Sequence, residues 1–338
     1  MTIREIAQLA KVSIGTVDRV IHNRGRVAPE TAEKIRRIIE ETGYKPNIHA
    51  RHLSLAKSYR FAVFTPERFQ DCGFWELPRG GIGRILEELA VFNISIDWYT
   101  FDRNSADSFR NTAHRLLEAG PDGVLLAPVL LEPSLEFCRA LQGNVPFVFF
   151  DSYLPDIEPL AYIGQDSFAS GVVSAHLMKL LVDEPTRIAV LQARKNDLHI
   201  CKRIDGFLSC FEGEEKPTVF IEEHLDEQDV CNRFLSRLLQ APGTWEGIFV
   251  ANAAVGRVAN YVDEHHFAVR LIGYDITEDG TTNLKNGRID FLISQKPQLQ
   301  VYHGLMLLYR HVVLKQTAAD DVVMPIDILT RENIDYYT

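Results

Sequence analysis

The sequence has few cysteines and no long apolar run, and both absences restrict its class. Its five cysteines include no Cys-x-x-Cys pair, and no histidine stands at a spacing typical of a metal site. We therefore expect reduced, mostly buried thiols and neither a metal nor a cofactor. No apolar stretch reaches the length of a membrane span, and Met1 leads directly into a charged amphipathic segment that is unlike a signal peptide. These features predict a cytoplasmic protein.

Catalytic motifs are also missing. The sequence contains no phosphate-binding loop, no Gly-x-Ser-x-Gly elbow and no His-Glu-x-x-His pattern. The stretch Arg79-Gly80-Gly81-Ile82-Gly83 is glycine-rich, but Leu86 stands where a dinucleotide fingerprint has its third glycine. We expect a binding protein rather than an enzyme.

The charge is divided unequally along the 338 residues. Residues 1–60 carry twelve Lys or Arg against six Asp or Glu, a net charge of +6. Because the whole chain carries −10, the remaining residues carry −16. Only this basic head has the sign that is needed to meet phosphates.

The head has the pattern of three short helices, over residues 2–10, 13–23 and 29–42. The first two are in helix-turn-helix spacing, with a break at Lys11-Val12, and Ser13 is a suitable N-cap for the second. The positions near its start that face outward would point at base edges and phosphates in a major groove: Ile14, Gly15, Thr16, Asp18 and Arg19. The structural alternative is a helical hairpin that only packs on a neighbour.

A short segment after the head is predicted to fold only on a partner. The sequence Tyr44-Lys45-Pro46-Asn47 breaks the third helix after its expected end at Gly43. The following residues, 48–53, have the pattern of one short helix, which is too short for independent stability in water.

Together these segments resemble the head of the lac repressor family. The match runs in register from Ile3-Arg4-Glu5-Ile6-Ala7 through Val12-Ser13-x-x-Thr16-Val17-x-Arg19-Val20 to Gly43-Tyr44-x-Pro46-Asn47 and Ala50-x-x-Leu53. The resemblance implies that the second helix reads the major groove and that a hinge helix enters the minor groove as a pair in a dimer. Gly15 offers no side chain to a base and Asp18 is acidic, so the operator sequence is not implied. The predicted DNA-contacting residues are Ser13, Ile14, Gly15, Thr16, Asp18, Arg19, Asn23, Asn47, Ala50, Arg51 and Leu53.

Beyond residue 58 apolar runs alternate with segments of helical periodicity, which predicts an α/β fold with parallel sheets covered on both faces. The runs are 61–64, 94–99, 123–127, 146–150, 188–191, 219–222, 247–251 and 271–274. Two such units, divided near 162–166, predict two lobes with a ligand between them at the carboxyl ends of the strands. The predicted domains are a helix-turn-helix domain (1–46), a hinge helix and linker (47–58) and an effector-binding domain (59–338), with an N-lobe of about 59–162 plus 295–323 and a C-lobe of about 163–294 plus 324–338.

This body resembles the type I periplasmic-binding-protein fold of ribose-type sugar-binding proteins, which is also found in the lac repressor family. The resemblance implies an effector site at residues that stand where strands end: Phe74, Trp75, Asp151, Ser152, Arg203, Asn252, Asp275 and Gln295. Aromatic faces suit a sugar ring, and these polar groups suit its hydroxyls, so a neutral carbohydrate is expected. Two alternatives stay open, a surface salt bridge for Arg203 and a core position for Trp75.

The predicted function is a sequence-specific DNA-binding transcriptional regulator, a repressor whose operator affinity is controlled by a small carbohydrate. A single helix-turn-helix reads too little DNA for specificity, so we expect a homodimer on a pseudo-palindrome. Residues 329–338 show no leucine heptads that would form a tetramer. The alternative is a cytosolic carbohydrate-binding protein whose basic head binds nucleic acid non-specifically.

Leu53→Ala should reduce specific DNA binding more than non-specific binding. An apolar wedge that opens a base step depends on sequence, whereas neutralisation of phosphates does not. Titration of an operator duplex and of a scrambled duplex at the same salt concentration measures both losses. Equal losses on the two duplexes would remove Leu53 from the hinge role.

Overall fold

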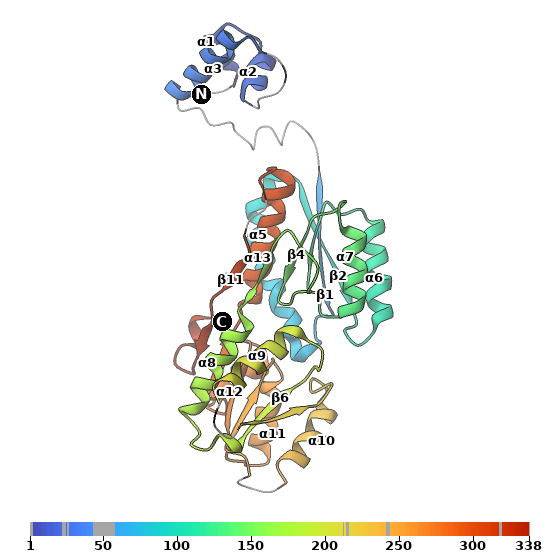
Figure 1. Ribbon diagram of the computed structural model, residues 1–338, viewed down its shortest axis with the longest axis vertical. Coiled ribbons are helices and arrows are strands. Elements are labelled where there is room, and N and C mark those ends of the chain that lie inside the picture. The colour runs from blue at the N-terminus through green and yellow to red at the C-terminus, as the bar shows by residue number, and fades with distance from the viewer. Residues whose placement is uncertain are drawn as a thin grey trace. The chain divides into compact units, whose positions relative to one another are not determined.

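The chain forms two compact units, Met1–Lys57 and Ser58–Thr338, in the computed structural model shown in Figure 1. The structure describes residues 3–21, 25, 27–42, 58–211, 213, 216–240, 244–317 and 320–337. The expected C-cap Gly43 and the hinge segment 47–57 lie outside these residues. In the described part of the chain, no helix has both the length and the apolar character needed to cross a membrane. All five cysteines are free thiols, and Cys138 and Cys231 are buried.

The first unit contains three helices, α1 (Ile3–Ala10), α2 (Ile14–Ile21) and α3 (Pro29–Thr42). The apolar positions that share a helical face in the sequence meet in one small core: Ile6, Ala7, Ala10, Val17, Val20, Ala32 and Ile35. The Lys34 ammonium donates to the carbonyl of Ala10 at 3.1 Å, so α3 supplies a cation to the C-terminus of α1.

The N-lobe of the body is built on a six-stranded sheet in the order β11-β5-β4-β3-β1-β2, with every pair parallel. Its strands are β1 (Tyr59–Pro66), β2 (Ile94–Phe101), β3 (Gly123–Leu126), β4 (Phe147–Phe150), β5 (Tyr162–Gln165) and β11 (Val322–Met324). One face is covered by α5 (Ile82–Leu89), α13 (Pro297–Leu308) and the 3-10 segment η1 (Asp71–Gly81), and the other by α6 (Ala106–Glu118) and α7 (Leu131–Leu141) (Figure 1).

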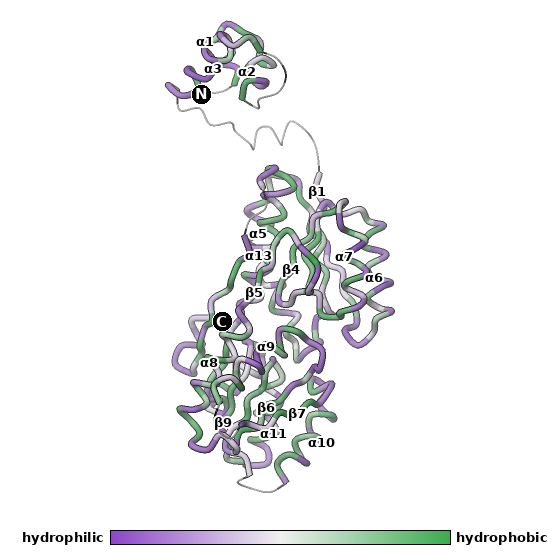
Figure 2. The backbone as a smooth tube through the Cα atoms, viewed as in Figure 1, coloured by the Kyte–Doolittle hydropathy of each residue, from purple (hydrophilic) through white to green (hydrophobic). Residues whose placement is uncertain are grey.

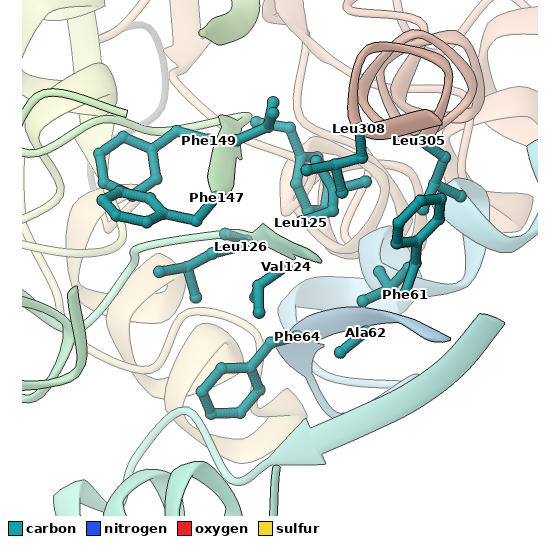
Figure 3. Packing of buried hydrophobic residues seen from close by; sticks show 14 of the residues in the cluster. Phe61, Ala62, Phe64, Val124, Leu125, Leu126, Phe147, Phe149, Leu305 and Leu308 are labelled. Atoms are coloured by element: carbon teal, nitrogen blue, oxygen red, sulfur yellow. The ribbon is translucent and has the colours of Figure 1, made fainter. Parts of the chain in front are cut away.

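Alternate residues of the N-lobe strands pack on opposite faces of the sheet. Figure 3 shows Leu305 and Leu308 of α13 next to Phe61 and Leu125. On the other face Phe64 lies against rings beneath α6, with its ring centroid 4.7 Å from that of Phe109. Hydrophobic and hydrophilic stretches alternate along the covering helices (Figure 2), as expected for helices that bury one side.

The C-lobe sheet has the order β12-β10-β9-β8-β6-β7. Its strands are β6 (Ile188–Gln192), β7 (Thr218–Ile221), β8 (Gly247–Val250), β9 (Arg270–Tyr274), β10 (Phe291–Ser294) and β12 (Asp327–Leu329). Helices α8 (Ser167–Lys179) and α9 (Leu198–Ser209) share one core with it, and α10 (Gln228–Leu238) and α11 (Val255–Glu264), with α12 (Glu278–Lys285) beside α11, share another. Short helical turns complete the body: η2 (Ala90–Phe92), η3 (Pro185–Arg187), η4 (Tyr309–Val313) and η5 (Ile334–Tyr336).

Strand β12 departs from the parallel arrangement predicted from the sequence, because it pairs antiparallel with β10. The preceding strand, β11, ends at the carboxyl edge of the N-lobe sheet and β12 begins three residues later. The chain therefore enters the C-lobe sheet at the edge where the parallel strands of that sheet end. Strand β12 consequently runs antiparallel to its neighbour β10.

The chain passes between the lobes three times, after β5, after β10 and between β11 and β12. The division between the lobes was expected near residues 162–166, with the N-lobe ending at about 162. Because β5 pairs with β4 and β11, it belongs to the N-lobe, and the first crossover follows Gln165, within that range. Met324, predicted in the C-lobe, is likewise the last residue of β11.

Helices α8 and α9 cross at two glycines. A Cβ atom at Gly171 would lie 1.9 Å from the carbonyl oxygen of Arg203, and one at Gly206 would lie 2.0 Å from that of Phe168. Real Cβ atoms do not approach backbone so closely, so only glycine permits this crossing. The crossing places α9, and with it Arg203, against the C-lobe sheet.

Gly171→Ala should lower the free energy of unfolding by about 2 kcal/mol or more, because overpacking against backbone forces the two helices apart. The matched control is Gly83→Ala in α5, where an added Cβ meets nothing within 4 Å. Urea unfolding of both variants measures the difference. A Gly171→Ala protein as stable as the control would show that the helices separate at no cost.

Candidate functional site

The second helix of the head begins at a capped turn. The Ser13 hydroxyl accepts a hydrogen bond from the Thr16 backbone N–H at 3.1 Å, which confirms the predicted N-cap. Val17 and Val20 face the core of the head, so the opposite side of α2 is turned toward solvent. The local sequence thus orients the helix before any partner is present.

The residues predicted to read DNA lie on this outward side. Ser13, Gly15 and Arg19 are exposed, Ile14 is 43% exposed, and Thr16 and Asp18 are half-buried. A Cβ at Gly15 would meet only the Ser13 hydroxyl, at 3.8 Å, so the packing of the head does not require glycine there. The missing side chain leaves room for close approach to another backbone. The remaining predicted DNA contacts lie outside the described residues: Asn23, Asn47, Ala50, Arg51 and Leu53.

A cavity between the two lobes of the body brings together seven of the eight predicted effector residues. Phe74, Trp75, Asp151, Arg203, Asn252, Asp275 and Gln295 line it. Ser152 is buried beside Asp151 but is not part of the lining. The open space is about 20 Å³, because charged side chains from the two lobes meet across it.

The cavity forms where strands of the two sheets end. Asp151 follows β4, Asn252 follows β8, Asp275 follows β9 and Gln295 follows β10. The carboxyl ends of parallel strands lie at one edge of a sheet, and the two sheets present these edges to each other. Asp151 and Asp275 adopt left-handed backbone with φ of 64° and 73°, which Asp tolerates better than most residues.

Arg203 is buried inside the C-lobe, so the alternative of a surface salt bridge is wrong. Its guanidinium donates to the carbonyl of Ala251 at 3.0 Å and to the side-chain oxygen of Gln295. It also lies 4.0 Å from the ring centroid of Tyr274. Its Nε has no hydrogen-bond partner among the described residues. Two hydrogen bonds and one ring contact therefore hold Arg203 in place, while its Nε–H donor is not used by these contacts.

Trp75 combines the two roles that the sequence left open. It is only 1% exposed and packs edge-on against Phe74 and Phe150, so it is part of the N-lobe core. It also lines the cavity, and its indole N–H donates to the Asp71 carboxylate at 2.7 Å. The ring is thus held by packing and by one buried hydrogen bond.

Two buried carboxyl groups of the cavity have raised pKa values. Burial raises the pKa of Asp151 to about 7, while the nearby Arg203 and Arg103 lower it and Asp275 and Asp197 raise it further. Burial also raises the pKa of Asp275 to about 6, against the lowering effect of Arg203 and of the hydrogen bond from Gln295. One oxygen of Asp151 has no partner in the described part of the chain. These groups can accept hydrogen bonds from a ligand.

The sequence interpretation missed five charged or titratable residues of the cavity: Asp71, Arg103, Arg194, Asp197 and His199. Burial, with Arg203 and Arg103, holds the pKa of His199 well below its usual range, so its ring is neutral. Arg103 and Arg194 each come two residues after an observed strand, β2 and β6, but four and three residues after the predicted runs 94–99 and 188–191, so the position of a residue near a strand end is the signal that could have found them. No cluster of His, Cys, Asp or Glu suited to a metal ion occurs among the described residues.

Asp151→Asn should stabilise the protein more at pH 8 than at pH 5. Because burial raises its pKa, the Asp151 carboxyl stabilises the fold while protonated, and this contribution is complete below the unfolded pKa of about 4 and is lost progressively as the pH rises through about 7. Asparagine stays neutral and accepts the same left-handed backbone, so it removes a penalty of up to a few kcal/mol, at about 1.4 kcal/mol per pKa unit.

Thermal unfolding at pH 5 and pH 8 checks this expectation. Asp205→Asn, an exposed carboxylate on α9, is the control and should shift neither midpoint. A melting temperature at pH 8 that is lower for Asp151→Asn than for the unaltered protein would contradict this expectation. It would show that neighbouring groups offset the desolvation penalty of the ionised Asp151 carboxylate.

Both units of the chain match known families. Residues 61–316, about three quarters of the chain, match the periplasmic binding protein domain. Residues 2–47 match the bacterial regulatory proteins of the lacI family. The second match covers the three helices and the capped turn at Ser13.

Named regulators match most of this chain. The ribose operon repressor of Halalkalibacterium halodurans is 27% identical over 256 residues, which cover 75% of this chain and 72% of the relative. The transcriptional regulator MalR of Streptococcus pneumoniae is 22% identical over 81% of this chain and 83% of its own length. A crystal structure assigned to a LacI transcriptional regulator from Bacteroides fragilis superposes with a TM-score of 0.75 at 28% identity, covering 83% of this chain and all of that one.

The capped helix-turn-helix, the two-lobed body with its cavity at the strand ends, and these matches agree. The chain is a DNA-binding transcriptional regulator of the lacI family whose body is a periplasmic-binding-protein domain.

Proposed function

We propose that this regulator represses transcription from a pseudo-palindromic operator as a homodimer, and that a small neutral carbohydrate in the lobe cavity controls its operator affinity. The observation that carries the proposal is the cavity itself, where aromatic side chains and hydrogen-bonding groups from both lobes surround one small space. A regulator of this kind acts where the DNA is, so the proposal places it in the cytoplasm. Its role is binding, not catalysis.

The charges of the cavity support a neutral ligand. Asp71, Asp151, Asp197 and Asp275 outnumber the three guanidinium groups that line it. Two of those groups, Arg103 and Arg194, already pair with carboxylates of this chain. Even with Asp151 partly protonated near pH 7, these groups leave no net positive charge for an anionic ligand, whereas sugar hydroxyls can donate to Asp151 and Asp275 and accept from Arg203.

The names of relatives support a sugar in particular. One relative is a ribose operon repressor, and another, from Sulfolobus acidocaldarius, is a xylose/arabinose-binding protein that is 24% identical over 75% of this chain and 67% of its own length. A pentose or a similar polyol is the chemistry that the proposal assigns to this cavity.

The proposed control links two equilibria. A ligand that binds one arrangement of the lobes better than another shifts the population toward it. In the dimer this shift changes how well the two heads can occupy adjacent half-sites. A difference of about 1.4 kcal/mol in ligand binding to the two arrangements is enough to change operator affinity tenfold.

The decisive experiment selects duplexes from a random pool at physiological salt, with and without a panel of neutral mono- and disaccharides. The proposal predicts one enriched pseudo-palindrome whose occupancy changes with a particular sugar. A sugar that binds without any enriched sequence would support instead a carbohydrate-binding protein with only non-specific nucleic-acid affinity. Sedimentation on the selected duplex should show two chains, and a single chain would contradict the dimer.

Two variants should separate the two activities. Arg19→Ala should weaken specific DNA binding by about 1–3 kcal/mol if it contacts a base, yet keep the thermal shift produced by the sugar. Asp275→Asn should keep the operator preference and lose most of the sugar response, because the amide replaces an acceptor oxygen by a donor. Loss of both activities in either variant would argue against separate sites.

A further inference from the structure

Two arginines reach across the gap between the lobes in opposite directions. Arg103 follows β2 in the N-lobe and pairs with Asp197 of the C-lobe as well as with Asp71 of its own lobe. Arg194 follows β6 in the C-lobe, and its Nη2 lies 3.3 Å from the Oδ1 of Asp71 in the N-lobe. Each lobe therefore supplies a cation to a carboxylate of the other.

Further contacts tie this group together. The Nη2 of Arg194 also lies 2.9 Å from the Oδ1 of Asp226, and its Nη1 donates to the side-chain oxygen of Asn104 at 2.8 Å. The second oxygen of Asp226 accepts from the Asp71 backbone N–H at 3.3 Å. All five charged residues are nearly or fully buried, with side-chain exposures between 6% and 11%. Buried ions persist only where partners satisfy them, so separation of the lobes would require water to replace these partners.

Asp71 is held in a strained conformation at the centre of the group. Asp71, Cys72 and Gly73 have successive φ values of 51°, 58° and 81°, in the left-handed region that residues other than glycine rarely adopt. Burial raises the pKa of Asp71, but Arg103 and Arg194 together lower it below its usual value, so the carboxyl is ionised. Its carboxylate accepts from Trp75 as well as from both arginines. Such strain is retained where surrounding contacts determine it.

The same residues form a wall of the cavity. Arg103, Arg194 and Asp197 line the inner cavity and also a wider groove outside it, of about 630 Å³. The groove is completed by residues 129–132 of the N-lobe and by Lys195, Leu198 and Glu223 of the C-lobe, among others. A molecule that passes from the groove to the cavity has to displace this wall.

We propose that Asp71, Arg103, Arg194, Asp197 and Asp226 form an ionic latch that joins the two lobes and closes the cavity, with Asp71 as the positioning residue that connects the latch to Trp75. The latch acts on the site to which the proposed function assigns a sugar, and it adds a regulatory element to that site. It favours closed lobes by contacts of the chain itself. Because the open space left in the closed cavity is only about 20 Å³, entry of a ligand requires some of these contacts to be displaced.

The test uses the full chain without DNA or sugar, so its outcome does not depend on the proposed function. With Trp98→Phe and Trp245→Phe as background, Trp75 is the only indole left, and acrylamide quenching of its fluorescence reports whether the cavity is open. Arg194→Gln touches both Asp71 and Asp226, but no contact joins it to Trp75 among the described residues. We expect its quenching constant to rise about threefold or more as the lobes separate.

The matched control is Arg187→Gln, which removes an ion pair with Glu246 inside the C-lobe and should leave quenching unchanged. Circular dichroism establishes that each variant is folded. If Arg194→Gln does not fold, Asp226→Asn, which changes the most exposed member of the latch, should raise quenching in its place. A folded variant that shields Trp75 as well as the background protein does, or an equal rise in the control, would overturn the latch.

Discussion

Compensation of buried charge is the constraint on which the body of this protein depends. Two sheets present their carboxyl ends to each other, so polar side chains from several strands are enclosed in one small space. An ion in such a place is tolerated only with hydrogen-bonding or opposite-charge partners. Arg103 and Arg194 pair with three carboxylates, and Arg203 contacts a carbonyl, an amide and a ring. An oxygen of Asp151 and the Nε of Arg203 are among the described cavity atoms that have no hydrogen-bond partner, and both suit a hydroxyl of a ligand.

Packing and chemistry are linked through α9. Gly171 and Gly206 let α8 and α9 approach until backbone meets backbone, and this contact fixes the helix that carries Arg203. The guanidinium then crosses beneath the strand ends to reach Gln295. A site built in this way is rigid within each lobe. Its remaining freedom is the relation between the lobes, where the latch and a ligand both act.

The head follows from local sequence to a greater extent than the body does. The spacing of apolar residues predicts all three helices, and the cap at Ser13 is a contact over three residues. In the body the eight apolar runs predict eight of the twelve described strands. The other four, β5, β10, β11 and β12, have only three or four residues each and are identified by their pairing with other segments. The pairing of β5 therefore decides where within the predicted range 162–166 the first crossover lies, and the crossover after β11 reverses the direction of β12.

Local sequence indicates the class of the protein, because charge sign and the periodicity of helices and strands are properties of neighbouring residues. The family resemblance that the sequence carries implied Asp151, Arg203, Asp275 and Gln295 as site residues, and the structure brings them to one cavity. The latch is different, since Asp71 and Arg194 are 123 positions apart and belong to different lobes. No local pattern encodes that distance. The two sheets face each other across the cavity, and this tertiary arrangement selects which charged side chains are buried together. Those side chains then have to pair with one another.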